Sequence, residues 1–71
     1  MPNKTDANIA TADVLTLLLH NQHALAAAIE EVALCLRATG YPETHTNVIA
    51  SLETLDANAS AISAGIFKLR Q

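Results

Sequence analysis

Residues 39–43, Thr39-Gly40-Tyr41-Pro42-Glu43, separate two long segments that are rich in the helix formers Ala and Leu. Gly40 suits the position just after a helix, because glycine reaches positive φ without a Cβ clash. Pro42 suits the first position of a new helix, where its missing N–H leaves no bond unmade. The stretch therefore predicts a tight turn between two helices, at about residues 10–39 and 42–69.

Apolar residues on both sides of this turn recur in alternating steps of three and four, which places each series on one face of a helix. Antiparallel helices joined by a tight turn bring together residues whose numbers sum to a constant, here about 80 or 81. Leu15 then faces Ile66, and Leu18 faces Ile62. The pattern predicts an all-α antiparallel two-helix hairpin with coiled-coil packing. The predicted seams, which we expect to supply its core and interface, are Leu15, Leu18, Gln22, Leu25, Ile29, Val32 and Leu36, and His45, Val48, Leu52, Leu55, Ala59, Ile62, Ile66 and Leu69.

One layer of these seams is polar. Gln22 is expected to face Ala59, with Asn21 and Asn58 beside them. A buried amide at a single seam position costs stability, but it specifies the register and the number of helices. A small-molecule or ion site at this layer is the alternative interpretation.

The apolar residues extend beyond the seams, for example at Val14, Leu17 and Leu34 on the first helix and at Phe67 on the second. An apolar face this wide needs at least two neighbouring helices, whereas a hairpin supplies each helix with only one. The simplest solution is a homodimer with two-fold symmetry, in which two hairpins form an antiparallel four-helix bundle.

Size and charge limit the other possibilities. We expect a disordered leader at residues 1–8 and a single small domain at residues 9–71. The net charge of −3 argues against a nucleic-acid-binding stripe and against attachment to an anionic membrane. The lone Cys35 has no partner for an internal disulfide, and no segment has the ~20 apolar residues of a membrane span. We therefore expect a cytoplasmic protein.

Residues with chemical potential are few. His20 and His23 lie three apart on a helix, so that both could bind one metal ion, but two ligands do not complete a site. The facing Asn58 and Ser60 are poor zinc ligands, and a surface role for both histidines is favoured. The sequence predicts no catalytic residues, no cofactor and no small-molecule substrate, and hence no enzyme.

Two stretches, residues 17–25 (LLLHNQHAL) and residues 52–58 (LETLDAN), resemble small uncharacterised helical-hairpin proteins of pseudomonads and related bacteria. The resemblance extends from about residue 14 to about residue 66, and it implies a bacterial protein. It carries no catalytic motif and no established function. In architecture alone, the predicted hairpin is similar to the plasmid RNA-binding protein Rop, a short helical hairpin that dimerises.

These observations lead to three functional hypotheses. The first is a non-enzymatic interaction or regulatory protein that forms a homodimeric four-helix bundle. The second is a subunit of a heteromeric complex, which docks its second apolar face on a larger protein. The third is an RNA-binding regulator of the Rop type, which requires Arg37, Lys68, Arg70 and the histidines to form one patch in the dimer.

Overall fold

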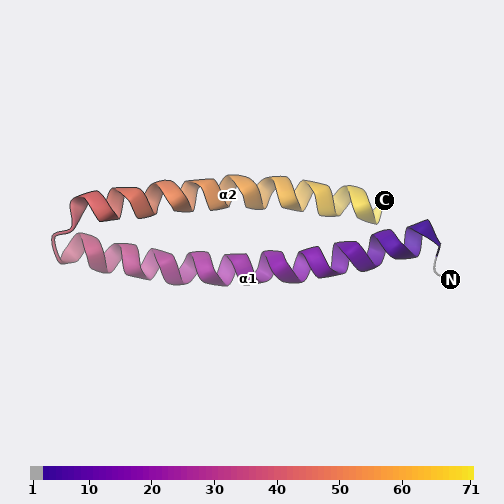
Figure 1. The fold of residues 1–71 in the computed structure, drawn as a ribbon, viewed down its shortest axis with the longest axis horizontal. Coiled ribbons are helices and arrows are strands. Elements are labelled where there is room, and N and C mark those ends of the chain that lie inside the picture. The colour runs from indigo at the N-terminus through magenta and orange to yellow at the C-terminus, as the bar shows by residue number, and fades with distance from the viewer. Residues whose placement is uncertain (1–2) are drawn as a thin grey trace.

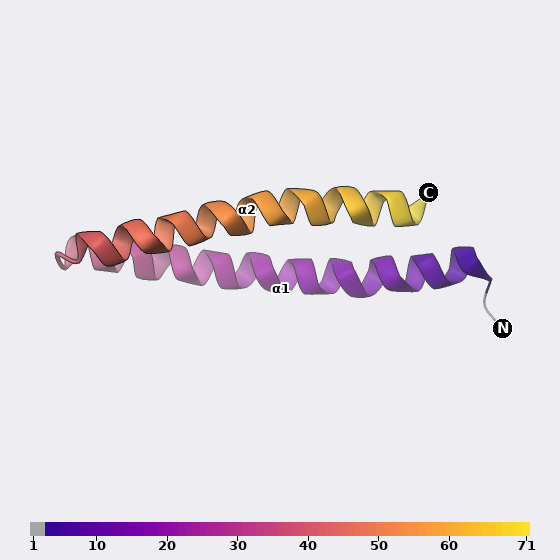
Figure 2. The same cartoon turned by 45° about the horizontal axis from the view of Figure 1, so that its top comes forward.

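The computed structural model describes residues 3–71, and it shows two antiparallel helices joined by a short turn (Figure 1). Helix α1 comprises Lys4–Ala38 and helix α2 comprises Pro42–Arg70. The hairpin forms a rod of 57 × 15 × 12 Å. Figure 2 shows that α2 crosses obliquely over α1 near the turn. The predicted all-α helical hairpin is therefore confirmed.

Helix α1 begins about six residues before the predicted start. The side-chain Oδ1 of Asn3 accepts a hydrogen bond of 2.8 Å from the Asp6 backbone N–H, so Asn3 caps the helix. Asp6 adds a negative charge in the first turn, where the helix dipole favours it. Residues 4–8 of the expected leader are thus helical, while residues 1–2 lie outside the described part of the chain.

The turn has the predicted chemistry. Gly40 has φ of 85°, in the left-handed region that favours glycine. The Tyr41 backbone N–H donates to the Leu36 carbonyl oxygen at 3.0 Å, which satisfies one of the last carbonyls of α1. Pro42 is the first residue of α2. This geometry ends one helix and starts the next within three residues, and α2 then returns along α1.

The seam of α2 lies against α1 as predicted. Leu52 and Ile66 are buried, and the other members are half-buried. Ala12, Leu19 and Ile66 form one buried cluster. Partly buried hydrophobic side chains of both helices pack against this cluster. They are Leu15, Ala59, Ile62 and Leu69.

The predicted seam of α1 is half wrong. Its alternate members, among them Leu15, face α2 and are half-buried. Leu18, Leu25 and Val32, which were expected to face α2, are instead 56%, 64% and 55% exposed. Their places are taken by the residues one position later in the chain. The inner series is therefore Ala12, Leu15, Leu19, Gln22, Ala26, Ile29, Ala33 and Leu36.

The physical reason is that α1 carries two overlapping series with the same alternation of three and four. They differ by a rotation of about 50° around the helix axis, which is half the ~100° between successive residues. The observed rotation places the alanines in the contact, where their small side chains let the two helices approach closely. Hydrophobic periodicity alone could not distinguish the two series.

Overfilling this contact should destabilise the hairpin. We expect Ala33→Leu, at a residue only 2% exposed, to lower the free energy of unfolding by about 1–3 kcal/mol, because three extra carbons must fit between packed helices. Ala27→Leu is the matched control, since Ala27 is exposed on the same helix. Urea unfolding followed by circular dichroism measures both. Equal losses for the two variants would contradict the observed rotation of α1.

Candidate interaction surface

One flank of the hairpin is polar. Arg70 Nη2 on α2 donates to Asp13 Oδ1 on α1 at 2.9 Å and to Thr16 Oγ1 at 3.3 Å, so these residues share one side of the molecule. Counting heptads from them along each helix assigns further residues to the same flank. The polar face comprises Asp13, Thr16, His20, His23, Ala27, Glu30, Leu34 and Arg37 of α1, and Thr46, Ile49, Glu53, Asp56, Ser60, Ser63, Phe67 and Arg70 of α2.

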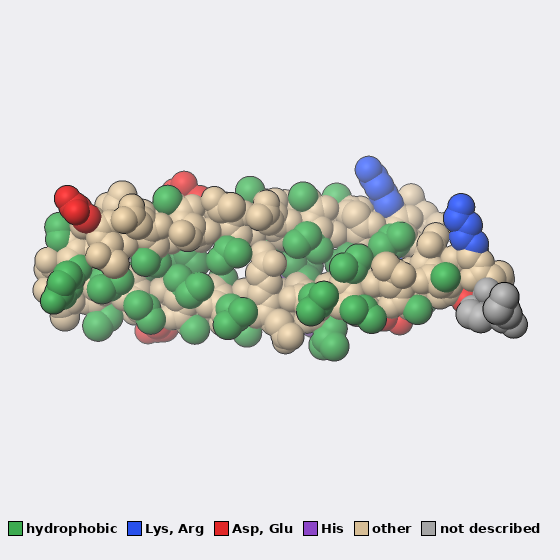
Figure 3. Space-filling view, viewed as in Figure 1, with side chains coloured by type: hydrophobic (Ala, Val, Ile, Leu, Met, Phe, Trp, Pro, Cys, Tyr) green, Lys and Arg blue, Asp and Glu red, His purple; other side chains and the backbone are tan. Residues whose placement is uncertain are grey.

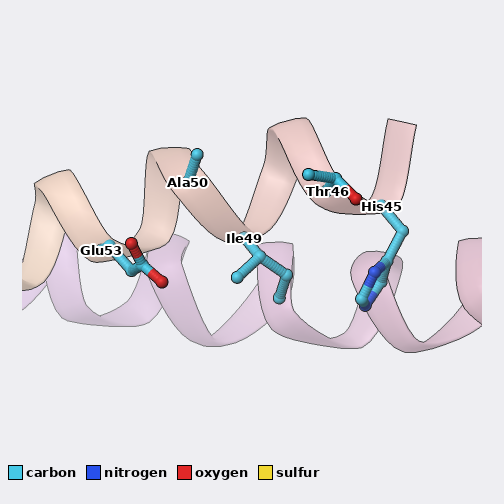
Figure 4. A pocket seen from close by; sticks show the side chains of 5 residues that line it. All are labelled: His45, Thr46, Ile49, Ala50 and Glu53. Atoms are coloured by element: carbon cyan, nitrogen blue, oxygen red, sulfur yellow. The ribbon is translucent and has the colours of Figure 1, made fainter. Parts of the chain in front are cut away.

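The depressions of the polar face are small. One of about 260 Å³ lies between the helices and is lined by Glu30, Ala33, Leu34, His45, Ile49 and Leu52. A neighbouring depression is lined by α2 alone (Figure 4). There, His45, Ile49 and Glu53 point toward α1, while Ala50 points away. The first volume falls just below the ~300 Å³ at which small-molecule pockets begin. These depressions join one imidazole to scattered carboxylates and assemble no nucleophile with a base.

The histidine pair lies on this polar flank. His20 and His23 are both exposed. Within residues 3–71, no group of three or more His, Cys, Asp or Glu side chains is placed to hold a metal ion. The two imidazoles therefore stand as surface groups on one side of α1.

The basic residues do not form one patch on the hairpin. Arg37 lies in the last turn of α1, near the loop, whereas Lys68 and Arg70 lie in the last turn of α2, at the open end. The guanidinium of Arg70 is also paired with Asp13. A single chain thus presents separate cations rather than the continuous stripe that follows a nucleic-acid backbone.

The opposite flank is apolar. By heptad position it carries exposed leucine and valine side chains from α1 and small side chains from α2. Figure 3 shows hydrophobic side chains on this side, most densely along α1, with basic side chains only at the open end. The apolar face comprises Thr11, Val14, Leu18, Asn21, Leu25, Ala28, Val32 and Cys35 of α1, and the smaller and mostly polar residues Thr44, Asn47, Ser51, Thr54, Asn58, Ala61 and Gly65 of α2.

Charge is absent from most of this face. Of the charged residues in the described part of the chain, only Lys4 and Lys68 lie on or beside it by helical position, and both are at the open end. Glu31 and Glu43 project from the sides of α1 and α2 that are turned away from the other helix. A surface without charge over most of a 57 Å rod is typical of one that another helix covers.

The core is also more deeply buried on the side of the polar face than on the side of the apolar face. All five buried hydrophobic residues of the described chain, Ala12, Leu19, Ala33, Leu52 and Ile66, lie on the half of the inner contact nearer the polar face. The half nearer the apolar face, which includes Leu15, Ile29, Leu55 and Ile62, is only half-buried. The hairpin therefore covers its core on one flank and leaves it open on the other.

Gln22 lies in this open half. Its side-chain Nε2 donates to the backbone carbonyl oxygen of Leu55 at 3.2 Å. In an α-helix that carbonyl also accepts the N–H of Ala59, so the predicted polar layer lies where it was expected. The bond holds α1 and α2 in one register without leaving an unpaired buried amide: within residues 3–71, no buried side-chain N or O lacks a hydrogen-bond partner.

Sequence reasoning identified the breadth of the apolar surface but not which residues form it. Leu18, Leu25 and Val32 were assigned to the hairpin core, and the structure places them on the apolar face. The alanines Ala12, Ala26 and Ala33 share the heptad position of Leu19, and that row of small residues was the available signal.

No protein-family model matches this chain, and no curated protein or solved structure is significantly similar to it. Within residues 3–71, neither helix combines the length and the hydrophobicity needed to cross a membrane.

Replacing the Gln22 amide with an aliphatic side chain should increase the stability of the hairpin and make its oligomeric state less uniform. We expect Gln22→Leu to raise the free energy of unfolding by about 1 kcal/mol, because it exchanges a half-buried amide for an aliphatic side chain while the Leu55 carbonyl keeps its helical bond. The same variant should broaden the distribution of oligomers in sedimentation velocity. Gln22→Glu is the matched polar control and should be less stable than the parent chain. A less stable Gln22→Leu would show that the amide bond outweighs the cost of burying it.

Proposed function

We propose that this chain is a non-enzymatic interaction protein that acts as a homodimer, in which two hairpins join their apolar faces into a four-helix bundle. The observation that carries the proposal is the uncharged apolar face, with Leu18, Leu25 and Val32 more than half exposed at intervals of seven residues. Exposed leucine and valine at heptad spacing are the side chains that coiled-coil partners bury.

The exposed surface area of the hairpin is large enough to support an extensive contact with a partner. The chain exposes 5344 Å², whereas a compact monomer of 7.5 kDa exposes about 4,250 Å². Its radius of gyration is 16.6 Å, compared with about 11 Å for a compact chain of this length. The excess of about 1,100 Å² follows from the rod shape of a lone hairpin, which leaves one flank of its inner contact open to water.

A second copy accounts for this excess. A compact protein of twice the mass exposes about 7,000 Å², so two hairpins that form such a body would bury on the order of 3,600 Å² in total. Obligate homodimers bury about 2,000–5,000 Å². The long, narrow shape of the hairpin suits this arrangement, because its whole length can join the contact.

The same features favour an interaction role over a chemical one. The most extensive feature of the described surface is a row of aliphatic side chains, and these supply binding energy without reactive groups. The titratable side chains are spread along the polar face, where His20, Glu30 and Asp56 are exposed to solvent. Groups exposed in this way are typical of the solvated side of an amphipathic bundle.

Charge on the apolar face should dissociate the dimer. We expect the parent chain to sediment at about 15 kDa, twice its 7.5 kDa, and Leu25→Glu to weaken dimerisation at least about a hundredfold, because it buries an unpaired carboxylate. Leu34→Glu is the matched control: Leu34 is a leucine of the same helix, 51% exposed, on the polar face. This control should remain dimeric. Sedimentation equilibrium over a range of micromolar concentrations measures all three.

Two results would contradict the proposal. A parent chain that is fully helical and monomeric at these concentrations would show that the apolar face needs no second copy. A parent chain that aggregates or melts without cooperativity would instead favour the heteromeric alternative, in which a different protein covers the face.

A further inference from the structure

The homodimer can be built in two ways that differ in which helices meet. In the same-end arrangement, the two-fold axis runs along the bundle, both turns lie at one end, and α1 of each chain covers α2 of the other. In the opposite-end arrangement, the axis is perpendicular to the bundle, so that α1 covers α1 and α2 covers α2. Resting on the proposed homodimer, we infer that the chain adopts the same-end arrangement, with the large residues of α1 packed on the small-residue row of the partner's α2.

The first observation concerns the sizes of the side chains on the apolar face. On α1 the row nearest α2 is large, with Leu18, Leu25 and Val32. On α2 the equivalent row is small or polar and has the same spacing of seven residues. It consists of Thr44, Ser51, Asn58 and Gly65. Each hairpin therefore presents a raised row and a low row side by side.

Gly65 is the second observation. A Cβ built at this residue meets nothing within 4 Å, so the packing of the hairpin does not require a glycine there. Gly65 lies inside α2 and has no positive φ, and glycine at such a position costs about 1 kcal/mol relative to alanine. The absence of a side chain is instead suited to the close approach of another helix on the apolar face.

The third observation is the register of the two rows. Residues of α1 and α2 that sum to about 81 lie at the same height, in line with the Arg70–Asp13 ion pair and with the inner series of the two helices, which run from Leu36 and His45 beside the turn. With this rule, each large residue of α1 lies at a height between two small residues of α2. From the open end to the turn the order is Gly65, Leu18, Asn58, Leu25, Ser51, Val32 and Thr44.

A two-fold axis along the bundle preserves these heights when the second chain is added. Each large side chain of α1 then enters a gap between two small residues of the partner's α2, as a knob enters a hole. Leu18, for example, lies between the partner's Gly65 and the partner's Asn58. Six such insertions, three from each chain, fill both contacts between the two chains with identical packing.

The same operation completes the polar layer. Asn58 lies about one residue from the height of Gln22 and two from that of Asn21, since its counterpart by the register is residue 23. The partner's Asn58 therefore comes level with these two amides. Buried amides need hydrogen-bond partners, and this arrangement gathers those of both chains in one layer.

In the opposite-end arrangement the two rows are less complementary in shape. It sets the raised rows of the two α1 helices against each other and the low rows of the two α2 helices against each other. The α2 contact would then join the row of Ser51, Asn58 and Gly65 to the equivalent small row of the partner, and neither row contains a large aliphatic side chain. Gaps of this kind lose dispersion contacts and leave hydroxyl groups facing one another.

Distances between spin labels distinguish the two arrangements. The full chain with Cys35→Ala receives one new cysteine, Glu43→Cys or Gln71→Cys, and a nitroxide is attached to it. Both positions are exposed and lie at the same heptad position, on the side of α2 away from α1. They are 28 residues apart, which is about 42 Å along a helix. Each chain carries one label, so any measured distance joins two chains.

In the same-end dimer, both variants should give distances within the width of a four-helix bundle, about 30 Å or less, because equivalent residues lie at equal heights. In the opposite-end dimer, at least one variant must give about 42 Å or more, wherever the axis crosses the helices. Asp56→Cys on the polar face, near the middle of α2, is the control that confirms dimerisation, and sedimentation checks that each labelled chain keeps the parent mass.

The outcomes separate this inference from the homodimer itself. Two short distances support the same-end arrangement. One long distance in a labelled protein that remains dimeric overturns that arrangement and leaves the homodimer standing. A monomeric mass with no measurable distance in the parent background overturns the homodimer, and the same-end arrangement with it.

Discussion

The close contact between a row of alanines on α1 and the inner side of α2 is the constraint on which the remaining features depend. Ala12, Ala26 and Ala33 occupy three of the four positions of this row, and Leu19 is the only large residue among them. Because the alanines are small, α1 rotates until they face α2. The rotation carries Leu18, Leu25 and Val32 out of the contact and onto the apolar face. One choice of side-chain size thus creates both the compact pair of helices and the surface that it cannot cover.

The two flanks of the hairpin differ in how their side chains are covered. On the polar face, charged and hydroxyl groups contact water and each other across the helices, as Arg70 does with Asp13 and Thr16. An exposed ion pair of this kind contributes little to stability. On the apolar face, aliphatic groups are exposed and the inner residues beneath them are half-buried. Further burial of aliphatic side chains can therefore stabilise the protein mainly on the apolar face. Gln22 lies on the same side, and its polar layer favours one register.

Much of the hairpin could be predicted because its signals are local. Gly40 and Pro42 act through their own backbone conformations, and α2 has a single apolar series, so its inner face was identified completely. The start of α1 was predicted about six residues too late, and the hydrogen bond from the Asp6 N–H to Asn3 Oδ1 identifies the residue that caps the helix. The candidate surface was predicted in breadth but not in composition, since α1 has two apolar series with one spacing.

The sequence by itself determined that there are two helices, where they reverse direction and which residues are level with one another, because turn chemistry and antiparallel pairing follow from residue type and position along the chain. Only the tertiary structure decided how α1 is rotated about its own axis. That rotation depends on how closely two particular surfaces can pack, which is a property of both helices together. It moves Leu18, Leu25 and Val32 from the expected core to the surface, and so shows which side of the hairpin another chain can cover.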